Sequence, residues 1–218
     1  MPRDADCGVS GRLQAAMRLD WAAFIGLPRE LWLHLIGEER RAWALLREGR
    51  GMNRPGINGR CAVHCAAALR DATLLQKLLD AGADPDPASI FPWTLPPLHV
   101  AVASAVSVPP LPRVVWLLLA RGAAVGRCAG WRRETVLALA ARRASMVLPE
   151  DSEFQEWQEV LAELALASGA GGIDAADRRG RTPLYSAAHK WVIAELLSRG
   201  AAVHSQDLRG VRAAHLPR

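Results

Sequence analysis

The stretch from Gly180 to Val203 constrains the fold more than any other part of this sequence, because it reads as two short helices with defined ends. The hydroxyl of Thr182 is suited to cap the first helix, and Pro183 to fill its first position, where no backbone N–H is needed. Gly200 is suited to end the second helix in the left-handed conformation. Core-facing positions are predicted at Leu184, Ala187 and Ala188 in the first helix, and at Val192, Ile193, Leu196 and Leu197 in the second.

The same pattern recurs earlier in the chain. Cys61, Pro96 and Thr135 align with Thr182, and small apolar residues of a first helix follow each of them. The second helices are expected to end at Gly82-Ala83, Gly122-Ala123 and Gly169-Ala170, as the last one ends at Gly200-Ala201. A helix pair of this kind cannot bury its apolar face alone, so consecutive units must stack. The sequence therefore predicts one array of stacked helix pairs.

The two ends of this array are less regular. Residues 1–28 are expected to form an N-terminal extension, and residues 29–55 a degenerate capping repeat whose charged side chains face solvent. The regular units span residues 56–207. Residues 208–218 begin another copy of the pattern and then stop, which predicts a truncated C-terminal repeat.

Two units contain insertions, near residues 104–112 and 145–156. The first is rich in proline. The second is acidic, with Glu150, Asp151, Glu153 and Glu156. A solvated loop is the simpler interpretation of this acidic insertion, and a contribution to a binding face is the alternative, because insertions in repeat proteins often gather on one face.

The motif Gly180-Arg-Thr-Pro-Leu-Tyr185, followed by a leucine-containing second helix and Gly200-Ala201, resembles the ankyrin repeat family, whose signature is G-x-T-P-L-H-x-A-A. This resemblance implies an all-α solenoid of stacked helix-turn-helix units with projecting β-turn or hairpin fingers. It also implies that function lies on the concave groove that the fingers form with the first helices.

The resemblance assigns most of the histidines to the scaffold. His34, His64, His99 and His215 occupy the histidine position of the family motif, where the side chain bonds backbone groups between neighbouring turns. Tyr185 replaces this histidine in the last full unit. The two remaining histidines, His189 and His204, are isolated in sequence and do not form a catalytic or metal-binding set.

The spacing of the cysteines argues against a metal site, and the sequence motifs argue against catalysis. Cys61-Ala-Val-His64-Cys65 offers three soft ligands, as a zinc site would. However, the repeat pattern places Cys61 at the threonine position and Cys65 at an apolar position that points into the repeat interface, so buried thiols are expected. Cys7 and Cys128 lie far away, and reduced thiols are expected for all four. Neither a nucleophile–histidine arrangement nor a glycine-rich phosphate loop stands out, so we expect a protein that is not an enzyme and has no cofactor.

Hydrophobic residues make up 50% of the chain, which is enough to bury a core and argues against disorder. The N-terminal residues lack the apolar segment of a signal peptide. The most apolar region, residues 93–120, is interrupted by prolines and by Arg113, so no membrane span is expected. We expect an intracellular protein, cytoplasmic or nuclear, and a monomer.

The candidate binding residues lie at the predicted finger tips. The net charge of +5 permits an acidic partner, and arginines recur along these tips as a line of positive charge. The exposed aromatic residues expected there are of the type enriched at interface hot spots. The candidates are Arg54, Arg60, Phe91, Trp93, Arg127, Trp131, Arg132, Arg133, Arg178 and Arg179, with Arg181 in the same line of charge. We expect a protein–protein interaction module whose groove receives an acidic or mixed acidic–apolar segment.

Two alternatives remain at this point. Leu27-Pro-Arg-Glu-Leu31, with Ile36, resembles the opening of an F-box, which implies a substrate adaptor of a ubiquitin ligase with ligase components as partners. However, Pro28 and Glu30 are also an ordinary helix start. A nucleic-acid-associated regulator is the second alternative, although no basic run with interleaved aromatic residues stands out.

Overall fold

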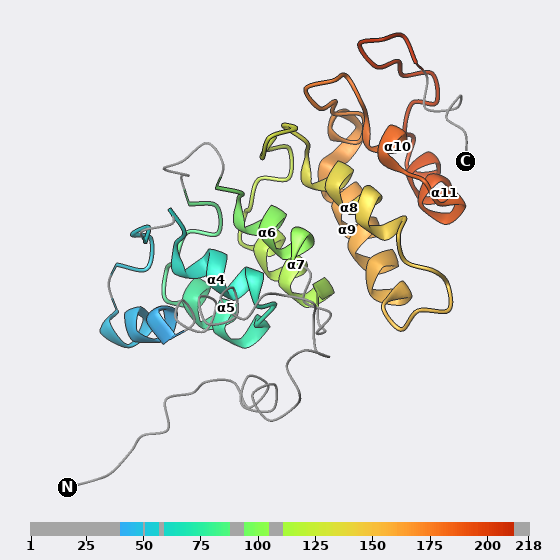
Figure 1. The fold of residues 1–218 in the computed structure, drawn as a ribbon. Helices are drawn as coiled ribbons and strands as arrows, with labels where there is room; N and C mark the ends of the chain where they lie inside the picture. The colour runs from blue at the N-terminus through green and yellow to red at the C-terminus, as the bar shows by residue number, and fades with distance from the viewer. Residues whose placement is uncertain (1–39, 50, 57–58, 88–93, 105–110, 212–218) are drawn as a thin grey trace, which may run out of the picture.

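The computed structural model describes residues 40–49, 51–56, 59–87, 94–104 and 111–211, and this part of the chain folds as a row of helix pairs (Figure 1). The all-α class predicted from the sequence is therefore confirmed. The pairs are α4 (Ala62–Ala68) with α5 (Ala72–Asp80), α6 (Pro97–Ala103) with α7 (Leu111–Ala120), α8 (Val136–Ala144) with α9 (Phe154–Gly172), and α10 (Pro183–Ser186) with α11 (Lys190–Ser198).

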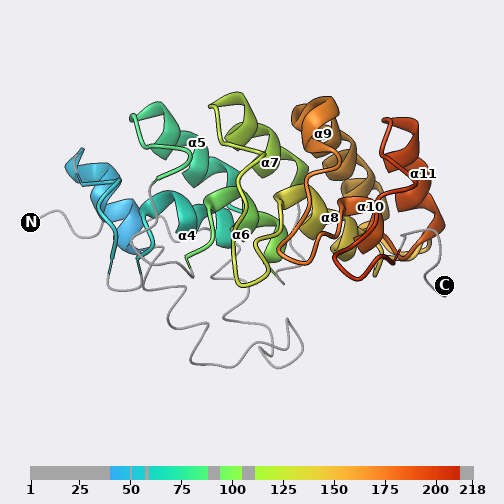
Figure 2. The ribbon, with the colours of Figure 1, turned by 90° about the horizontal axis from the view of Figure 1, so that it is seen from above.

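The helices form two layers. The first helices, α4, α6, α8 and α10, lie side by side in one layer, and the second helices, α5, α7, α9 and α11, lie in the other (Figure 2). Each helix contacts its partner within the unit and its equivalents in the neighbouring units. This arrangement is the ankyrin-like solenoid that the sequence predicts.

The core is continuous along the stack and lies between the two layers. Small buried residues in the first helices, such as Ala66 and Ala67 in α4 and Ala140 in α8, allow neighbouring units to approach closely. Leucines from the second helices, such as Leu74 and Leu78, are also buried and belong to the same core. The apolar face of each pair is thus covered by the next pair, as expected for a repeat array.

The second helices end in the same way in successive units. Gly82, Gly122 and Gly200 adopt φ values of 86°, 89° and 89°. The backbone N–H of the following alanine then donates to a leucine carbonyl five residues earlier, for example from Ala201 to Leu196 at 3.0 Å. Gly169 (φ 62°, ψ −177°) breaks the helical geometry of α9 at the predicted place.

The last unit corrects three predictions. Helix α10 ends at Ser186, so Ala187 leaves in an extended conformation and Ala188 is exposed rather than part of an apolar helix face. From Thr182 to Gly200 this unit has fewer residues than the first regular unit has from Cys61 to Gly82, so its first helix must end early. The hydroxyl of Thr182 makes no capping bond, whereas that of Thr135 accepts from the Ala138 N–H at 3.3 Å. Leu197 is 39% exposed because it lies on the outer side of α11.

The described end of the predicted capping repeat packs onto the first regular unit. Residues 40–48 are helical, with Ala42 buried and Leu45 and Leu46 packed against the core. The Lys77 ammonium of α5 lies 4.9 Å from the centre of the Trp43 ring. The predicted first helix of this repeat and the F-box-like residues 27–36 lie outside the described residues. The proposed domain limits therefore stay predictions.

The acidic insertion packs against the rest of the molecule through part of its length. Arg70 is buried at the end of α4, and its Nη2 donates to the Ser104 carbonyl at 3.1 Å. Burial lowers the pKa of the Arg70 guanidinium, and the negative charges of Glu153 and Glu156 oppose this effect. The Glu156 carboxylate also accepts from the Leu111 N–H at the start of α7. The outer part of the insertion, Glu150 and Asp151, is exposed as predicted.

A guanidinium from the other side completes this contact at the end of α6. Arg143, in the last turn of α8, donates to the Ala103 carbonyl, next to the Ser104 carbonyl that Arg70 contacts. Two arginines from flanking units thus satisfy carbonyl groups that α6 leaves open at its C-terminus.

As for bilayer insertion, none of the helices within the described ranges is both long and apolar enough to span a membrane.

Candidate functional site

The turns between units project beyond the first-helix layer as fingers. Residues 56–60, 177–181 and 207–211 share one closing pattern, in which the first N–H donates to the carbonyl four residues later, at 2.8, 2.9 and 2.9 Å. The finger of residues 129–134 is closed by an antiparallel bridge between Ala129 and Glu134. The turn and hairpin fingers predicted from the sequence are therefore present.

Aspartate side chains hold the last two fingers in shape. Oδ1 of Asp177 accepts from the backbone N–H groups of Arg179 and Arg181 at 2.8 and 3.0 Å, and Oδ1 of Asp207 accepts from those of Arg209 and Val211, both at 2.9 Å. Burial works against ionisation of Asp177, but the hydrogen bonds from Arg181 and Arg179 together lower its pKa. The hydrogen bond from Val211 contributes most to the lowered pKa of Asp207.

Neighbouring fingers are hydrogen-bonded to one another in one register. The Arg178 N–H donates to the Arg132 carbonyl at 3.0 Å, and the Leu208 N–H donates to the Arg179 carbonyl at 2.9 Å. Because both bonds join equivalent positions, three consecutive fingers form a continuous row, which we call the finger row (residues 129–134, 177–181 and 207–211). Arg132, Arg179 and Arg209 occupy one equivalent position of this row, and Trp131, Arg178 and Leu208 occupy the position before it.

Arg133 stands where the other fingers carry glycine. Gly59, Gly180 and Gly210 adopt left-handed φ values of 72°, 78° and 77°, and Arg133 adopts a φ of 50° at the equivalent place. A side chain in this region costs about 1–2 kcal/mol relative to glycine. A Cβ on Gly180 would also lie 2.9 Å from the Leu208 nitrogen, whereas Arg133 is exposed. The finger thus keeps a basic side chain at a strained position, a situation common at functional sites.

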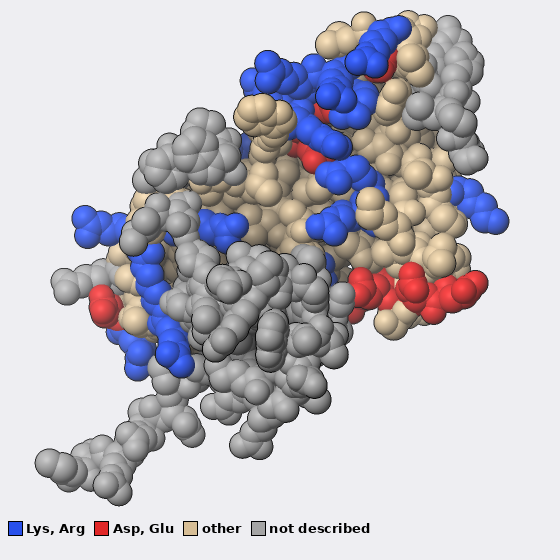
Figure 3. Space-filling view, in the orientation of Figure 1, with Lys and Arg blue, Asp and Glu red and all other residues tan. Residues whose placement is uncertain are grey.

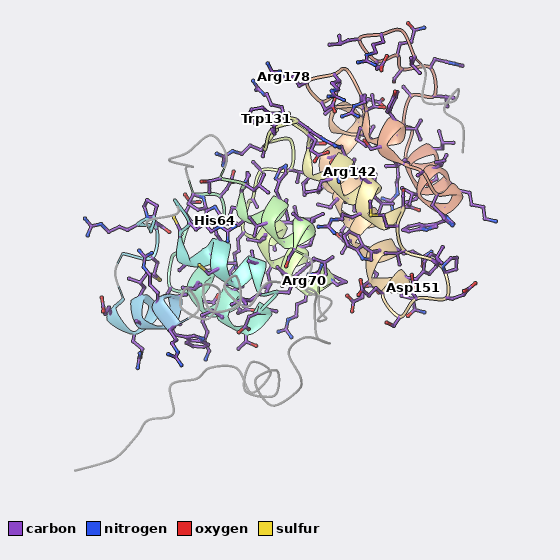
Figure 4. All side chains as sticks on the ribbon, viewed as in Figure 1. His64, Arg70, Trp131, Arg142, Asp151 and Arg178 are labelled. Atoms are coloured by element: carbon purple, nitrogen blue, oxygen red, sulfur yellow. The ribbon has the colours of Figure 1, made fainter. Side chains whose placement is uncertain are left out.

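Several of the predicted residues come together on the finger row. Arg132, Arg133, Arg178 and Arg179 are all exposed. Lysine and arginine side chains gather over this edge of the molecule, while acidic side chains gather at another edge (Figure 3). Trp131 and Arg178 lie at the finger edge, and Asp151 marks the opposite, acidic end of the α8–α9 unit (Figure 4).

Other predicted residues do not join this group. Arg127 is half-buried and pairs with Asp86 at 2.6 Å, and Arg181 pairs with Asp177 at 2.5 Å, so their charges are compensated within the protein. Arg54 is exposed and Arg60 half-buried, but both belong to the finger of the first regular unit. The aromatic candidates Phe91 and Trp93 lie outside the described residues.

A groove of about 390 Å³ lies beside the 129–134 finger, between this finger and helices α6 and α8. Its apolar lining includes Leu95, Leu139 and Met146, and its rim carries Trp131 and Arg132. Trp131 is 93% exposed and Met146 is 69% exposed. This groove is the best candidate for a binding site within the described part of the chain.

Sequence reasoning missed the arginines inside the groove. Arg142 and Arg143 follow the small residues of α8, and both line the groove. Arg142 pairs with Glu134 at 2.8 Å, and Arg143 donates to the Ala103 carbonyl, so both are held by the protein. Arg132 makes no ion pair with any described residue. A basic pair in the last turn of a first helix, next to the groove, was the signal that could have identified them.

His99 supports the wall of this groove and connects two units. Its Nε2 lies 3.2 Å from the Glu134 carbonyl of the next finger. The equivalent His64 instead accepts, through Nδ1, from the Cys61 N–H at 3.1 Å. Pro96 takes the place of Cys61 in the unit of His99 and has no N–H to offer. Burial, the largest effect, lowers the pKa of His99 to about 4, so the ring is neutral at physiological pH.

The thiols of Cys61 and Cys65 are buried in the scaffold as predicted. The Cys61 thiol donates to the Asn53 carbonyl at 3.2 Å, and the Cys65 thiol to the Cys61 carbonyl at 3.6 Å. Burial raises the pKa of Cys61, which disfavours a thiolate. Cys128 is an exposed free thiol. Among the described residues, no three potential metal ligands converge on one point.

The comparisons with known proteins identify one unit by family. The ankyrin repeat family model matches residues 179–208, which comprise part of the 177–181 finger, α10, α11 and the beginning of the 207–211 finger. The chain therefore contains an ankyrin repeat, and its other helix pairs stack in the same arrangement. Ankyrin repeats serve as protein-interaction modules. The search among curated proteins found no similar sequence.

Proposed function

We propose that this protein binds an acidic or mixed acidic–apolar segment of another protein in the groove beside the 129–134 finger, without catalysing a reaction. The observation that carries the proposal is the combination of an almost fully exposed Trp131 with Arg132, which has no ion pair among the described residues, at the rim of an apolar groove. Tryptophan and arginine are the residue types that dominate interface hot spots.

The chemistry of the groove supports a partner with both apolar and acidic side chains. Leu95, Leu139 and Met146 offer apolar surface, which favours an apolar side chain of the partner. Arg132 presents a planar guanidinium that matches carboxylate geometry. Glu134 is already paired with Arg142, so it contributes little repulsion toward an incoming carboxylate.

The arginines on the finger row support electrostatic attraction of such a partner. An exposed set of like charges speeds association with an acidic segment, and this effect weakens as salt concentration rises. Removing positive charge at the rim should therefore mainly slow association.

The test compares affinity purifications of the wild-type protein and the double variant Arg132→Glu, Arg133→Glu. We expect the variant to lose the specific partner, because two charges next to the groove are reversed. A matched control reverses Arg113 and Lys190, which are exposed and lie outside the finger row. Retention of the same partner at the same level by the Arg132/Arg133 variant would contradict the proposed groove.

Once the partner is purified, its rate of association with the protein can be measured. Stopped-flow association at several salt concentrations should show a slower rate and a weaker salt dependence for the Arg132/Arg133 variant than for the Arg113/Lys190 control. If single-stranded oligonucleotides of unrelated sequence compete fully for the groove, with a steep salt dependence, the protein is instead a nucleic-acid binder.

A further inference from the structure

We infer, building on the proposed function, that the partner segment lies along the finger row in a polyproline II conformation, with a carboxylate at every third residue. The carboxylates would face Arg132, Arg179 and Arg209, one on each finger. The ligand class is thus an acidic, proline-containing segment of another protein.

The first step is the equivalence of the three arginines. The bond from Arg178 to the Arg132 carbonyl and the bond from Leu208 to the Arg179 carbonyl repeat the same register between successive fingers. Asp177 and Asp207 also hold the backbone N–H groups of Arg179 and Arg209 in the same way. Because the three positions are equivalent, the arginines recur at the repeat spacing of the solenoid, and all three side chains are exposed.

The second step is the length of that spacing. Stacked helices lie about 8–10 Å apart, and equivalent residues of neighbouring units recur at a similar distance. A polyproline II helix has three residues per turn and rises about 3.1 Å per residue, so every third side chain lies on one face at intervals of about 9 Å. In a β-strand, side chains three residues apart point to opposite faces. The polyproline II conformation therefore matches the row of arginines.

The third step concerns the apolar ends of the row. Trp131 and Leu208 occupy equivalent positions on the first and third fingers, and they are 93% and 79% exposed. Aromatic surfaces are common docking sites for proline-rich segments. The finger row thus offers an apolar contact at each end and an arginine on every finger, which matches a segment that combines prolines with regularly spaced carboxylates.

The test uses fluorescence anisotropy with the full-length protein and two labelled peptides of equal composition. One peptide carries glutamate at every third position of a proline–alanine background, and the other carries the same number of glutamates at every second position. We expect the first peptide to bind about tenfold more tightly at physiological ionic strength, because it engages more arginines at once. Equal affinities would overturn the inference.

Substitutions at the arginines make the test specific. Replacing Arg132, Arg179 and Arg209 together by glutamine should remove the preference between the two peptides. Their side chains are exposed, and the fingers are closed by backbone hydrogen bonds, so the fold should persist and can be checked by circular dichroism. A matched control replaces Arg113, Arg199 and Lys190 by glutamine and should keep the preference. A preference that survives in the finger variant would overturn the inference.

These results separate the inference from the proposed function. If the Arg132→Glu, Arg133→Glu variant loses its protein partner but the two peptides bind equally, the groove function stands and the spacing of carboxylates is wrong. If neither the partner nor the peptides depend on these arginines, both proposals fail. If a single-stranded oligonucleotide of the same charge binds more tightly than either peptide, the finger row recognises polyanions, and the inference is overturned.

Discussion

At the scale of single residues, His99 shows how burial sets the pH dependence of stability. Its ring is neutral and contacts the Glu134 carbonyl across a unit boundary. Its pKa falls from 6.5 to about 4 on folding, mainly because of burial. Between these values the unfolded chain binds the proton and the folded protein does not, so stability decreases as the pH falls.

We predict a loss of about 3 kcal/mol in the free energy of unfolding as the pH falls from about 6.5 to about 4, since each pKa unit corresponds to about 1.4 kcal/mol. Urea denaturation at a series of pH values in this range measures the slope. The variant His99→Gln should show a shallower slope, while His204→Gln, on an exposed residue, should behave as the wild type. Identical slopes for His99→Gln and the wild type would exclude this role of His99.

Individual residues also show where the sequence was informative and where it was not. The glycine positions predicted the ends of the second helices, because the left-handed conformation favours one residue type. By contrast, the sequence did not predict that ion pairs with Asp86 and Asp177 compensate the charges of Arg127 and Arg181. Arg127 pairs with Asp86, which belongs to the preceding unit, and this contact exists only after the units stack.

At the scale of structural elements, the end of α6 depends on two neighbouring units. Arg70 at the end of α4 and Arg143 in α8 both donate to its last carbonyls. Glu153 and Glu156 compensate the buried charge of Arg70, and Glu156 also holds the start of α7. The acidic insertion therefore stabilises the junction of several helices in addition to being solvated at its outer part.

We predict that Arg70→Ala lowers the free energy of unfolding by about 2 kcal/mol, because a buried, charge-assisted hydrogen bond is lost and two carboxylates lose a nearby cation. Arg70 already has a positive φ of 52°, so alanine adds no backbone strain of a new kind. Chemical denaturation measures the effect, with exposed Arg113→Ala as the control. A change below about 0.5 kcal/mol, which is typical of surface positions, would contradict the proposed role.

Some features of the helices, such as the position where α10 ends, could not be predicted from the sequence. The last unit is shorter than the first regular unit, but this did not identify Ser186 as the end of α10. That end depends on packing, since the Ala188 N–H donates to the Ser145 hydroxyl of the preceding unit at 2.9 Å. For the same reason, the motif could not show that Met146, which follows α8, lines the groove.

At the scale of the whole molecule, the buried surface is unevenly distributed along the stack. In α11 the fully buried residues are Val192 and Leu196, and α10 is a single short turn. By contrast, α7 buries Leu111, Val114, Val115, Leu117 and Leu118. In a repeat array, each unit is stabilised by its own contacts and by its neighbours, so the last unit should open most readily.

We predict that amide hydrogens of α11 exchange with solvent faster than those of α7, as measured by hydrogen–deuterium exchange with mass spectrometry. The Trp191 ring packs edge-on against Phe154 with ring centres 5.1 Å apart, which connects α11 to α9. Trp191→Ala should therefore accelerate exchange in α11 and leave α7 unchanged. Equal protection of α7 and α11 in the wild type would show that the stack opens as one cooperative unit.

The hydrogen bonds between fingers have a mechanical consequence. They lie at the tips of the molecule, away from the two helix layers, so they act on bending with a long lever arm. Any flexing that spreads the tips must break the bond from Arg178 to Arg132 or the bond from Leu208 to Arg179, while the helix packing barely changes. The finger edge between residues 129 and 211 should therefore resist stretching, and this part of the molecule should bend toward its fingers more easily than away from them.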